Sequence, residues 1–432
     1  MQSLNSFRQR PPASSPEGFY GWRIVALSSI ALVMTAPGQT AAISVFIDPV
    51  VNDLGISRSL ISTAYLIGTL AGALCMPFIG RLFDRHGARL TMAFVGAGFG
   101  AMLFVLAATT GPAHLTLGFA GVRMLGQGAL GLCATTVTAL WFVQRRGSIL
   151  GLVAAIGAAG ISLAPVLLEP LISAHGWRIA WAVEGGLVWA IVIPLAVWGL
   201  KDHPAHLGQE ADGAHRQSDH AATTRAWGLT RSQALRNPFF WLVTSGVAVS
   251  GALSTAVAFH QISLLGERGL TTIEAAGNFL PQMAASLAAT LITGALADRA
   301  STRWVIVGCM MTLSIGLLVG TVVTPGWSAI GFGVLIGAAG GSIRTLEAAT
   351  FPRFFGTLHL GSIRGLVTAI SVGSTALGPV TFALIHDRQH SYIPALYAGA
   401  TLPLAVAIAA LLIRQPATNN QRPTLASPTF PD

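Results

Sequence analysis

Twelve long apolar runs, separated by short polar stretches, dominate this sequence of 432 residues. A helix that rises about 1.5 Å per residue needs about 20 predominantly apolar residues to cross the hydrocarbon core of a bilayer. With 53% hydrophobic and 9% charged residues, the chain carries more apolar surface than a water-soluble core of its size can bury. We therefore expect an all-α membrane protein with twelve transmembrane helices.

Hydropathy and breaker residues place these helices in two groups of six. The spans are predicted near 22–46, 59–79, 90–109, 114–143, 148–171, 177–199, 238–262, 273–296, 304–324, 327–350, 363–385 and 392–413. Five regions follow: a cytoplasmic N-terminal tail 1–21, a bundle 22–200, a cytoplasmic linker 201–236, a bundle 237–414, and a disordered cytoplasmic tail 415–432.

The net charge of +9 does not indicate nucleic-acid binding, because the basic residues lie between apolar runs instead of forming one stripe. Positive charges collect on the cytoplasmic side of a membrane. Most arginines fall on the side of both termini, and those on the other side are Arg58, Arg178, Arg268 and Arg388. The sequence thus predicts cytoplasmic termini, and its arginine-rich, lysine-poor composition points to a bacterial inner membrane.

Neither the cysteines nor the linker histidines predict a metal site or a disulfide framework. Cys75, Cys133 and Cys309 fall inside apolar runs, where we expect buried thiols. The linker histidines are loosely spaced, and the chain has no G-x-x-x-x-G-K-[ST] loop for a nucleotide. We expect no metal, no cofactor and no use of ATP, so a gradient must drive any transport.

A charged motif recurs after the second and the eighth span, in the pattern G-x-x-x-D-R-x-(G)-x-R. The first copy contains Gly80, Asp84, Arg85, Gly87 and Arg89, and the second contains Gly294, Asp298, Arg299, Ser301 and Arg303. About half the chain separates the copies, as expected for two homologous six-helix halves. The motif resembles motif A of the major facilitator superfamily, which implies two pseudo-symmetric six-helix bundles, the major facilitator fold.

The resemblance implies that both copies take part in gating. Charges at the membrane surface can latch a helix to its neighbour across the boundary between the halves, and opening toward the cytoplasm breaks the latch. A topogenic charge cluster would explain the arginines but not Asp84, Gly87 or the recurrence. Ser301 replaces the second glycine, which puts a tight turn there in doubt.

Two further stretches narrow the resemblance. The residues from Glu17 to Trp22 precede the first span, and those from Trp141 to Gly151 precede the fifth. Together they resemble the signature stretches of monocarboxylate transporters and bacterial oxalate/formate antiporters, which implies a small organic anion as substrate. Those transporters carry an arginine in the eighth span, and the oxalate exchanger type also a lysine in the eleventh. This chain has neither, so an anion site must be built differently.

Charged side chains within a bilayer are costly and usually face the bundle interior. Arg123 in the fourth span and Arg344 in the tenth each offer a planar fork that can hold a carboxylate. Arg344 could instead pair with Glu347, three residues further on. Glu347 could also join the second charged motif, and we favour this gating role over proton carriage.

Neutral polar residues complete the candidate substrate site. The first span is interrupted from Thr35 to Thr40, where Pro37 and Gly38 weaken the helix and free polar groups for a cavity. The neutral candidates are Gln39, Tyr65, Gln127, His260 and Gln282. Glu184 and His260 are also candidates for proton coupling, with a purely structural role as the alternative for each.

The sequence therefore predicts a secondary active transporter that moves a small, monocarboxylate-like organic anion by alternating access, coupled to protons or to a counter-substrate. We expect a monomer in the lipid bilayer, without a nucleic-acid partner. An efflux transporter for amphipathic molecules, a transport-inactive membrane sensor and a membrane enzyme remain alternatives. An enzyme should show clustered His, Asp or Cys residues, and the spans show none.

Overall fold

The computed structural model describes residues 19–142, 145–211, 228–356 and 360–416. Apart from isolated bridge residues, such as the pair Gly228 and Gly356, all regular structure in this part is helical. Within it, 12 helices are long and apolar enough to cross a membrane. This confirms the predicted fold class.

The N-terminal bundle contains α1 (Gly21–Val33), η1 (Ala36–Gly38), α2 (Thr40–Leu54), α3 (Arg58–Ala107), α4 (Pro112–Val122), η2 (Arg123–Leu130), α5 (Gly131–Trp141), α6 (Arg146–His175), α7 (Trp177–Pro194) and η3 (Leu195–Gly199). The short η4 (Pro204–Leu207) follows it. The C-terminal bundle contains α8 (Arg231–Leu235), α9 (Pro238–Gly266), α10 (Thr272–Gly277), α11 (Phe279–Arg299), α12 (Thr302–Gly320), α13 (Trp327–Phe355), α14 (Leu360–Gln389) and α15 (Ile393–Leu412).

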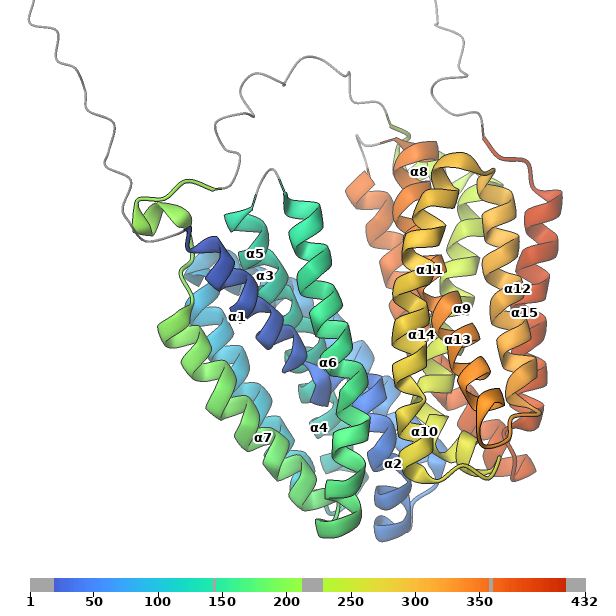
Figure 1. Cartoon of the computed structure of the whole chain (residues 1–432), viewed down its shortest axis with the longest axis horizontal. Coiled ribbons are helices and arrows are strands. Elements are labelled where there is room, and N and C mark those ends of the chain that lie inside the picture. Colours follow the sequence, from blue (N-terminus) through green and yellow to red (C-terminus); the bar gives the residue numbers. More distant parts are fainter. Residues whose placement is uncertain (1–18, 143–144, 212–227, 357–359, 417–432) are drawn as a thin grey trace, which may run out of the picture.

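The two bundles lean together at one end and diverge at the other (Figure 1). We call the end where α1 begins and α15 finishes the terminal end, and the end where α2 finishes and α15 begins the distal end. Toward the distal end, α2 contacts α9, and α6 contacts α10 and α11. The cavity described below lies between the bundles on the terminal side of these contacts.

The first span is broken where the sequence predicts. Because Pro37 and Gly38 interrupt the helix, α1 gives way to the short 3-10 segment η1, and α2 starts again at Thr40. The span is nevertheless longer than predicted, reaching Leu54. The break leaves the carbonyl of Gly38 free to accept a hydrogen bond from another helix.

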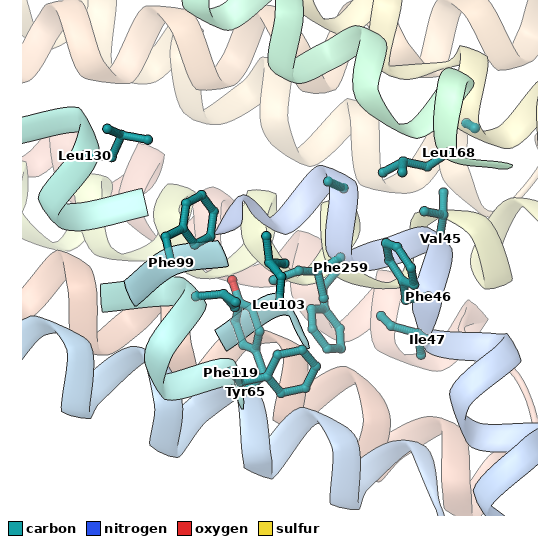
Figure 2. Packing of buried hydrophobic residues seen from close by; sticks show 14 of the residues in the cluster. Val45, Phe46, Ile47, Tyr65, Phe99, Leu103, Phe119, Leu130, Leu168 and Phe259 are labelled. Carbon is teal, nitrogen blue, oxygen red and sulfur yellow. The ribbon is translucent and has the colours of Figure 1, made fainter. Parts of the chain in front are cut away.

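Packed aromatic side chains join the two bundles. Tyr65 of α3 contacts Phe259 of α9, with ring centroids 4.6 Å apart, and Phe119 of α4 meets Tyr65 edge-on at 6.1 Å. Figure 2 shows these three rings at the centre of the buried cluster. The hydrophobic core therefore runs from one bundle into the other.

The signature stretches pack against each other at the terminal end. Phe19 and Tyr20 lie 6.0 Å and 5.7 Å from Trp141, and Trp22 lies 5.7 Å from Phe142, measured between ring centroids. This arrangement ties α1 to the end of α5 and gives the aromatic residues a structural role.

A corresponding contact lies in the second half of the chain. Phe239 at the start of α9 meets Phe354, with ring centroids 5.0 Å apart. The two halves therefore share this aromatic packing at the terminal end.

One expectation about the cysteines is wrong. Cys133 and Cys309 are buried, but Cys75 is exposed on the surface of the helices. Next to it Leu74 is 82% exposed, so this face of α3 is apolar and directed outward. In a membrane-spanning helix the outward face meets lipid, so an apolar run does not by itself imply burial in protein.

Candidate substrate cavity

A cavity of about 620 Å³ lies between the two bundles. Side chains of α2 and α6 form one wall, and side chains of α9, α11 and α13 form the other. The polar residues of its lining are Gln39, Thr40, Ser162, Ser254, Thr255, Gln282, Ser286, Thr290 and Arg344. The described lining includes no aspartate or glutamate.

Close packing of α11 against α13 builds one wall of the cavity. Gly333, Gly337 and Gly341 form a ridge on α13, and a Cβ atom on each would overlap Asn278, Gln282 and Ser286, respectively, on α10–α11. This spacing of small residues lets two helices approach backbone to backbone. The sequence analysis missed this ridge, although the G-x-x-x-G-x-x-x-G pattern could have revealed it.

Arg344 reaches the cavity from the next turn of α13. Its Nη2 donates a hydrogen bond to Ser286 Oγ at 2.9 Å, and its side chain is exposed to the cavity. Because the hydroxyl is neutral, this contact orients the guanidinium without neutralising it. The role of Arg344 as a substrate ligand stays a prediction.

Gln282 occupies the same wall, one helical turn before Ser286. Its Nε2 donates to Gln261 Oε1 at 2.6 Å and to Asn278 Oδ1 at 3.1 Å. Gln261 and Asn278 are both buried. The sequence predicts Gln282 as a site residue but not the two amides that hold it.

Arg123 lines a second, smaller cavity of about 210 Å³ together with Gln127 and residues of α3 and α14. Its Nε donates to Thr69 Oγ1 and its Nη1 to the Gly38 carbonyl, both at 3.1 Å. The guanidinium carbon lies 4.7 Å from the centre of the Tyr65 ring. This buried cation is thus held by neutral acceptors and a π-face, within a π-helical segment that often marks a functional site.

Gln39 and Tyr65 occupy different positions relative to the cavities. Gln39 lines the larger cavity, and its Nε2 donates to Thr35 Oγ1 at 3.1 Å. Tyr65 is fully buried and shares a hydrogen bond of 2.7 Å with Thr40. Tyr65 is not part of the described lining of either cavity. It contacts Arg123 and Thr40 from within the protein core.

The two proton-coupling candidates lie away from both cavity linings. His260 is buried, its Nε2 donates to the Pro379 carbonyl at 2.9 Å, and its Nδ1 lies 3.0 Å from the Tyr392 hydroxyl. Burial raises the pKa of Tyr392, which keeps that hydroxyl protonated as a donor to Nδ1. A neutral His260 ring is therefore satisfied at both nitrogens.

Glu184, the other candidate, is buried on α7, and its Oε2 has no hydrogen-bond partner among the described residues. It therefore lies within the N-terminal bundle and does not reach the described lining of either cavity.

The first charged motif forms a turn that a neighbouring carboxylate holds. Gly87 has φ +79°, a conformation that favours glycine, and a Cβ atom there would lie 2.8 Å from the carboxyl carbon of Asp202. The carboxylate of Asp202 accepts a hydrogen bond from the backbone N–H of Arg89 at 2.8 Å. Asp202 lies in the linker region, and the sequence analysis missed it.

The second copy of the motif turns without a glycine conformation. Ser301 has φ −65°, and its Oγ donates to Gln415 Oε1 at 3.3 Å. The doubt about a tight turn at this serine is therefore justified.

The remaining gating candidates are only partly described. Arg85 and Arg89 are exposed, Arg303 is half-buried at the start of α12, and Glu347 is half-buried on α13. Gly80 lies within α3, and the side chains of Asp84, Asp298 and Arg299 are outside the described part of the structure.

Polar contacts close the distal end, and the sequence analysis missed them. The carboxylate of Asp387 on α14 accepts a hydrogen bond from the backbone N–H of Ser59 on α3 at 3.1 Å, which joins the two bundles. Beside it Arg58 pairs with Asp48, and His386 pairs with Glu267 at 2.9 Å. A contact between residues 328 positions apart leaves no local pattern in the sequence.

Known proteins share this architecture. The family model described as Major Facilitator Superfamily matches residues 28–281. The uncharacterized MFS-type transporter YcxA of Bacillus subtilis is 24% identical over 365 residues, which cover 81% of this chain and 84% of that protein. The aspyridones efflux protein apdF of Emericella nidulans is 27% identical over 323 residues, covering 71% of this chain and 60% of its own length. A crystal structure of the nucleoside transporter NupG, in a mutant form, matches with a TM-score of 0.71 at 12% identity, covering 92% of this chain and 100% of that one.

Proposed function

This chain belongs to the Major Facilitator Superfamily, and we propose that it is a secondary active transporter that moves a small organic anion of the monocarboxylate type. The twelve candidate membrane helices of the described residues and the transporter relatives make it a membrane transport protein and not an enzyme. The anionic substrate and the coupling are the parts that we propose.

The observation that carries the proposal is the position of Arg344. Its guanidinium lies on the wall of the cavity between the bundles, bonded to the neutral hydroxyl of Ser286. The described lining brings no carboxylate to neutralise it. An arginine without a carboxylate partner in the described lining attracts a carboxylate, which it can bind through two parallel hydrogen bonds.

We place the transporter in a bacterial inner membrane as a monomer, with both termini in the cytoplasm. In this orientation the terminal end faces the cytoplasm, and the contact between Ser59 and Asp387 closes the outer side. Alternating access would then exchange distal closure for closure at the charged motifs around Gly87 and Ser301. A proton or a counter-substrate would supply the driving force, since binding of the anion alone gives no net accumulation.

Membership of the monocarboxylate and oxalate/formate group is the finer part of the proposal. The packing of Phe19, Tyr20 and Trp22 onto Trp141 and Phe142 supports it, because both signature stretches meet in one cluster. The anion ligand on α13 replaces the arginine that the group carries in the eighth span. In this chain that span presents Asn278, Gln282 and Ser286 instead.

Efflux of amphipathic molecules is a second candidate. The N-terminal wall of the cavity is made largely of small apolar side chains, among them Ala154, Ala155 and Ala158. Such a wall suits an apolar ligand, and the relative from Emericella nidulans is named as an efflux protein. Against this candidate stands Arg344, a fixed charge that an uncharged amphipath would have to desolvate.

The test is uptake of labelled lactate, pyruvate, formate and oxalate by proteoliposomes, with and without an inward proton gradient. We expect the wild-type protein to take up at least one of these acids. Arg344→Gln should reduce that uptake at least tenfold, because a charge-assisted hydrogen bond contributes about 1.5–3 kcal/mol. Stimulation by the gradient would indicate proton coupling, and stimulation by unlabelled acid inside the vesicles would indicate exchange.

Arg353→Gln is the matched control, because this arginine lies on the same helix but outside the described cavity lining. It should leave uptake near the wild-type rate. If none of the acids is taken up, the monocarboxylate proposal is wrong. If the Arg344 variant transports normally, the site assignment is wrong.

A further inference from the structure

The amide of Gln282 can point in one direction only, because two backbone carbonyls determine the whole amide network. Asn278 Nδ2 donates to the Ala329 carbonyl at 2.6 Å, so the other terminal atom of Asn278, facing Gln282, is its oxygen. Gln261 Nε2 donates to the Ala275 carbonyl at 3.0 Å, so the atom of Gln261 that faces Gln282 is also an oxygen. Carbonyls only accept hydrogen bonds, which excludes the opposite orientation of either amide.

Gln282 must therefore present its nitrogen to both oxygens. Its Nε2 lies 2.6 Å from Gln261 Oε1 and 3.1 Å from Asn278 Oδ1, and these two bonds use both of its amide hydrogens. A flipped amide would bring oxygen against oxygen at the same distances. The network thus removes the donors of Gln282 and leaves its Oε1 as an acceptor.

This acceptor is available to a ligand. Gln282 lines the cavity, and no described group donates a hydrogen bond to its Oε1. This oxygen is therefore left to accept a hydrogen bond from a ligand inside the cavity.

Gln282 and the anion ligand stand next to each other. Ser286, which bonds Arg344, follows Gln282 by four residues of α11, about 6 Å along the helix axis. A molecule bound by the guanidinium thus reaches Gln282 with a group a few bonds away from its carboxylate. A methyl or methylene group at that point would leave a polar atom unpaired, whereas a hydroxyl or N–H group would satisfy it.

We infer that the substrate is an organic anion that carries a hydrogen-bond donor, a hydroxyl or an N–H group, near its carboxylate, and that Gln282 Oε1 recognises this donor. The inference rests on the proposed function, because Arg344 supplies the anion contact. Gln261 and Asn278 are positioning residues that orient the acceptor. Simple acids such as formate and acetate would bind Arg344 but would offer no hydrogen-bond donor to Gln282 Oε1.

The test compares acids that differ in one hydroxyl group: glycolate with acetate, lactate with propionate, and 3-hydroxybutyrate with butyrate. Each acid is titrated into the purified full-length protein, and its dissociation constant is obtained from the ligand-dependent rise of the melting temperature, followed by tryptophan fluorescence. We expect the wild-type protein to bind the hydroxylated member of at least one pair about tenfold more tightly than its partner.

Three variants show which residue is responsible. Gln282→Leu should bring the ratio of the two dissociation constants close to one. Gln261→Leu should lower the ratio while Gln282 is still present, because Asn278 alone then orients the amide. Gln389→Leu, a glutamine at the exposed end of α14 and outside the described lining of both cavities, should keep the wild-type ratio.

The outcomes separate the two claims. If acids bind to the wild-type protein but hydroxylated and plain acids bind equally well, the donor requirement is wrong and the anion-transporter proposal stands. A ratio that survives in both Gln282→Leu and Gln261→Leu would also overturn the inference. If no acid binds, the proposed function itself fails. If Gln282→Leu or Gln261→Leu does not fold, the other of these two variants alone is sufficient for the test.

Discussion

Single residues in this protein are constrained by partners that are distant in sequence. Gly87 is such a case, because its positive φ and its contact with Asp202 both exclude a larger side chain. The motif around Gly87 could be recognised from its recurrence alone. Its partner Asp202 could not, since it lies more than a hundred residues further on and is an ordinary aspartate in a polar stretch.

This pair predicts a coupled effect on stability. Gly87→Ala should lower the free energy of unfolding by about 1–3 kcal/mol, since alanine must adopt a strained φ and meets the Asp202 carboxylate. Asp202→Ala should cost about 1 kcal/mol through the lost hydrogen bond to Arg89. The double variant should be less destabilised than the two single effects together, because one of the clashing groups is gone. Unfolding in detergent measures all three, and strict additivity would contradict the proposed contact.

The site residues illustrate what can be predicted at this scale. Arg123, Arg344, Gln39 and Gln282 stand out because polar groups are rare and costly within apolar runs, and all four reach a cavity wall. His260 stands out for the same reason, yet its ring is satisfied by Pro379 and Tyr392. Sequence identifies the polar group, whereas only the fold decides whether a protein partner or a ligand completes it.

Helix pairs depend on features that hydropathy does not measure. The spans themselves are predictable because their length is set by the membrane, and the break in the first span is predictable from Pro37 and Gly38. Which helix faces pack against each other is not predictable, because the small residues of a packing face cannot be told from other small residues in an apolar run. Gly157 and Gly160 of α6 lie against Leu32 and Val33 of α1, where a larger side chain would push the two helices apart.

The glycine ridge of α13 gives an element-scale prediction. Gly341→Ala should destabilise the protein by about 1–3 kcal/mol, because its Cβ atom would overlap the backbone of Ser286 and force α11 and α13 apart. The neighbouring Gly340 has open space at its Cβ position. Gly340→Ala should therefore be neutral, or stabilising by up to about 1 kcal/mol. Melting temperatures in detergent distinguish the two, and equal effects would show that the ridge does not hold the helices together.

The whole molecule is organised by its internal repeat. The recurrence of the charged motif predicts two six-helix halves, and the structure contains two bundles joined by a linker region. The contacts between the halves could not be predicted. The repeat shows that the halves are alike, but it does not show which of their residues meet. The closure of the distal end depends on a few contacts such as the one between Ser59 and Asp387.

Weakening this closure should change the distribution of conformations. Asp387→Ala removes the acceptor for the Ser59 N–H group, and a loss of about 1 kcal/mol would shift the equilibrium about fivefold toward opening of the distal end. Spin labels at Asn52→Cys and Gln389→Cys, in a protein with its three native cysteines replaced, would report the distance between the bundles. We expect a larger population at long distance.

Arg388→Gln is the matched control, since Arg388 is exposed and adjacent to Asp387 but makes no described hydrogen bond or ion pair. Its distance distribution should match the wild type. Identical distributions in all three proteins would show that the contact between Ser59 and Asp387 does not hold the distal end closed.

The backbone contact between α11 and α13 has a consequence for the direction of transport. Two helices in backbone contact along a glycine ridge cannot slide or tilt independently. We therefore expect α11 and α13 to move as one rigid body during alternating access. Gln282 and Arg344, one on each helix, would then keep the same separation whichever side of the membrane the cavity faces. Absolute affinity can differ between the two faces because the opposite wall moves. The preference for one anion over another should not, and influx and efflux would show the same chemical selectivity.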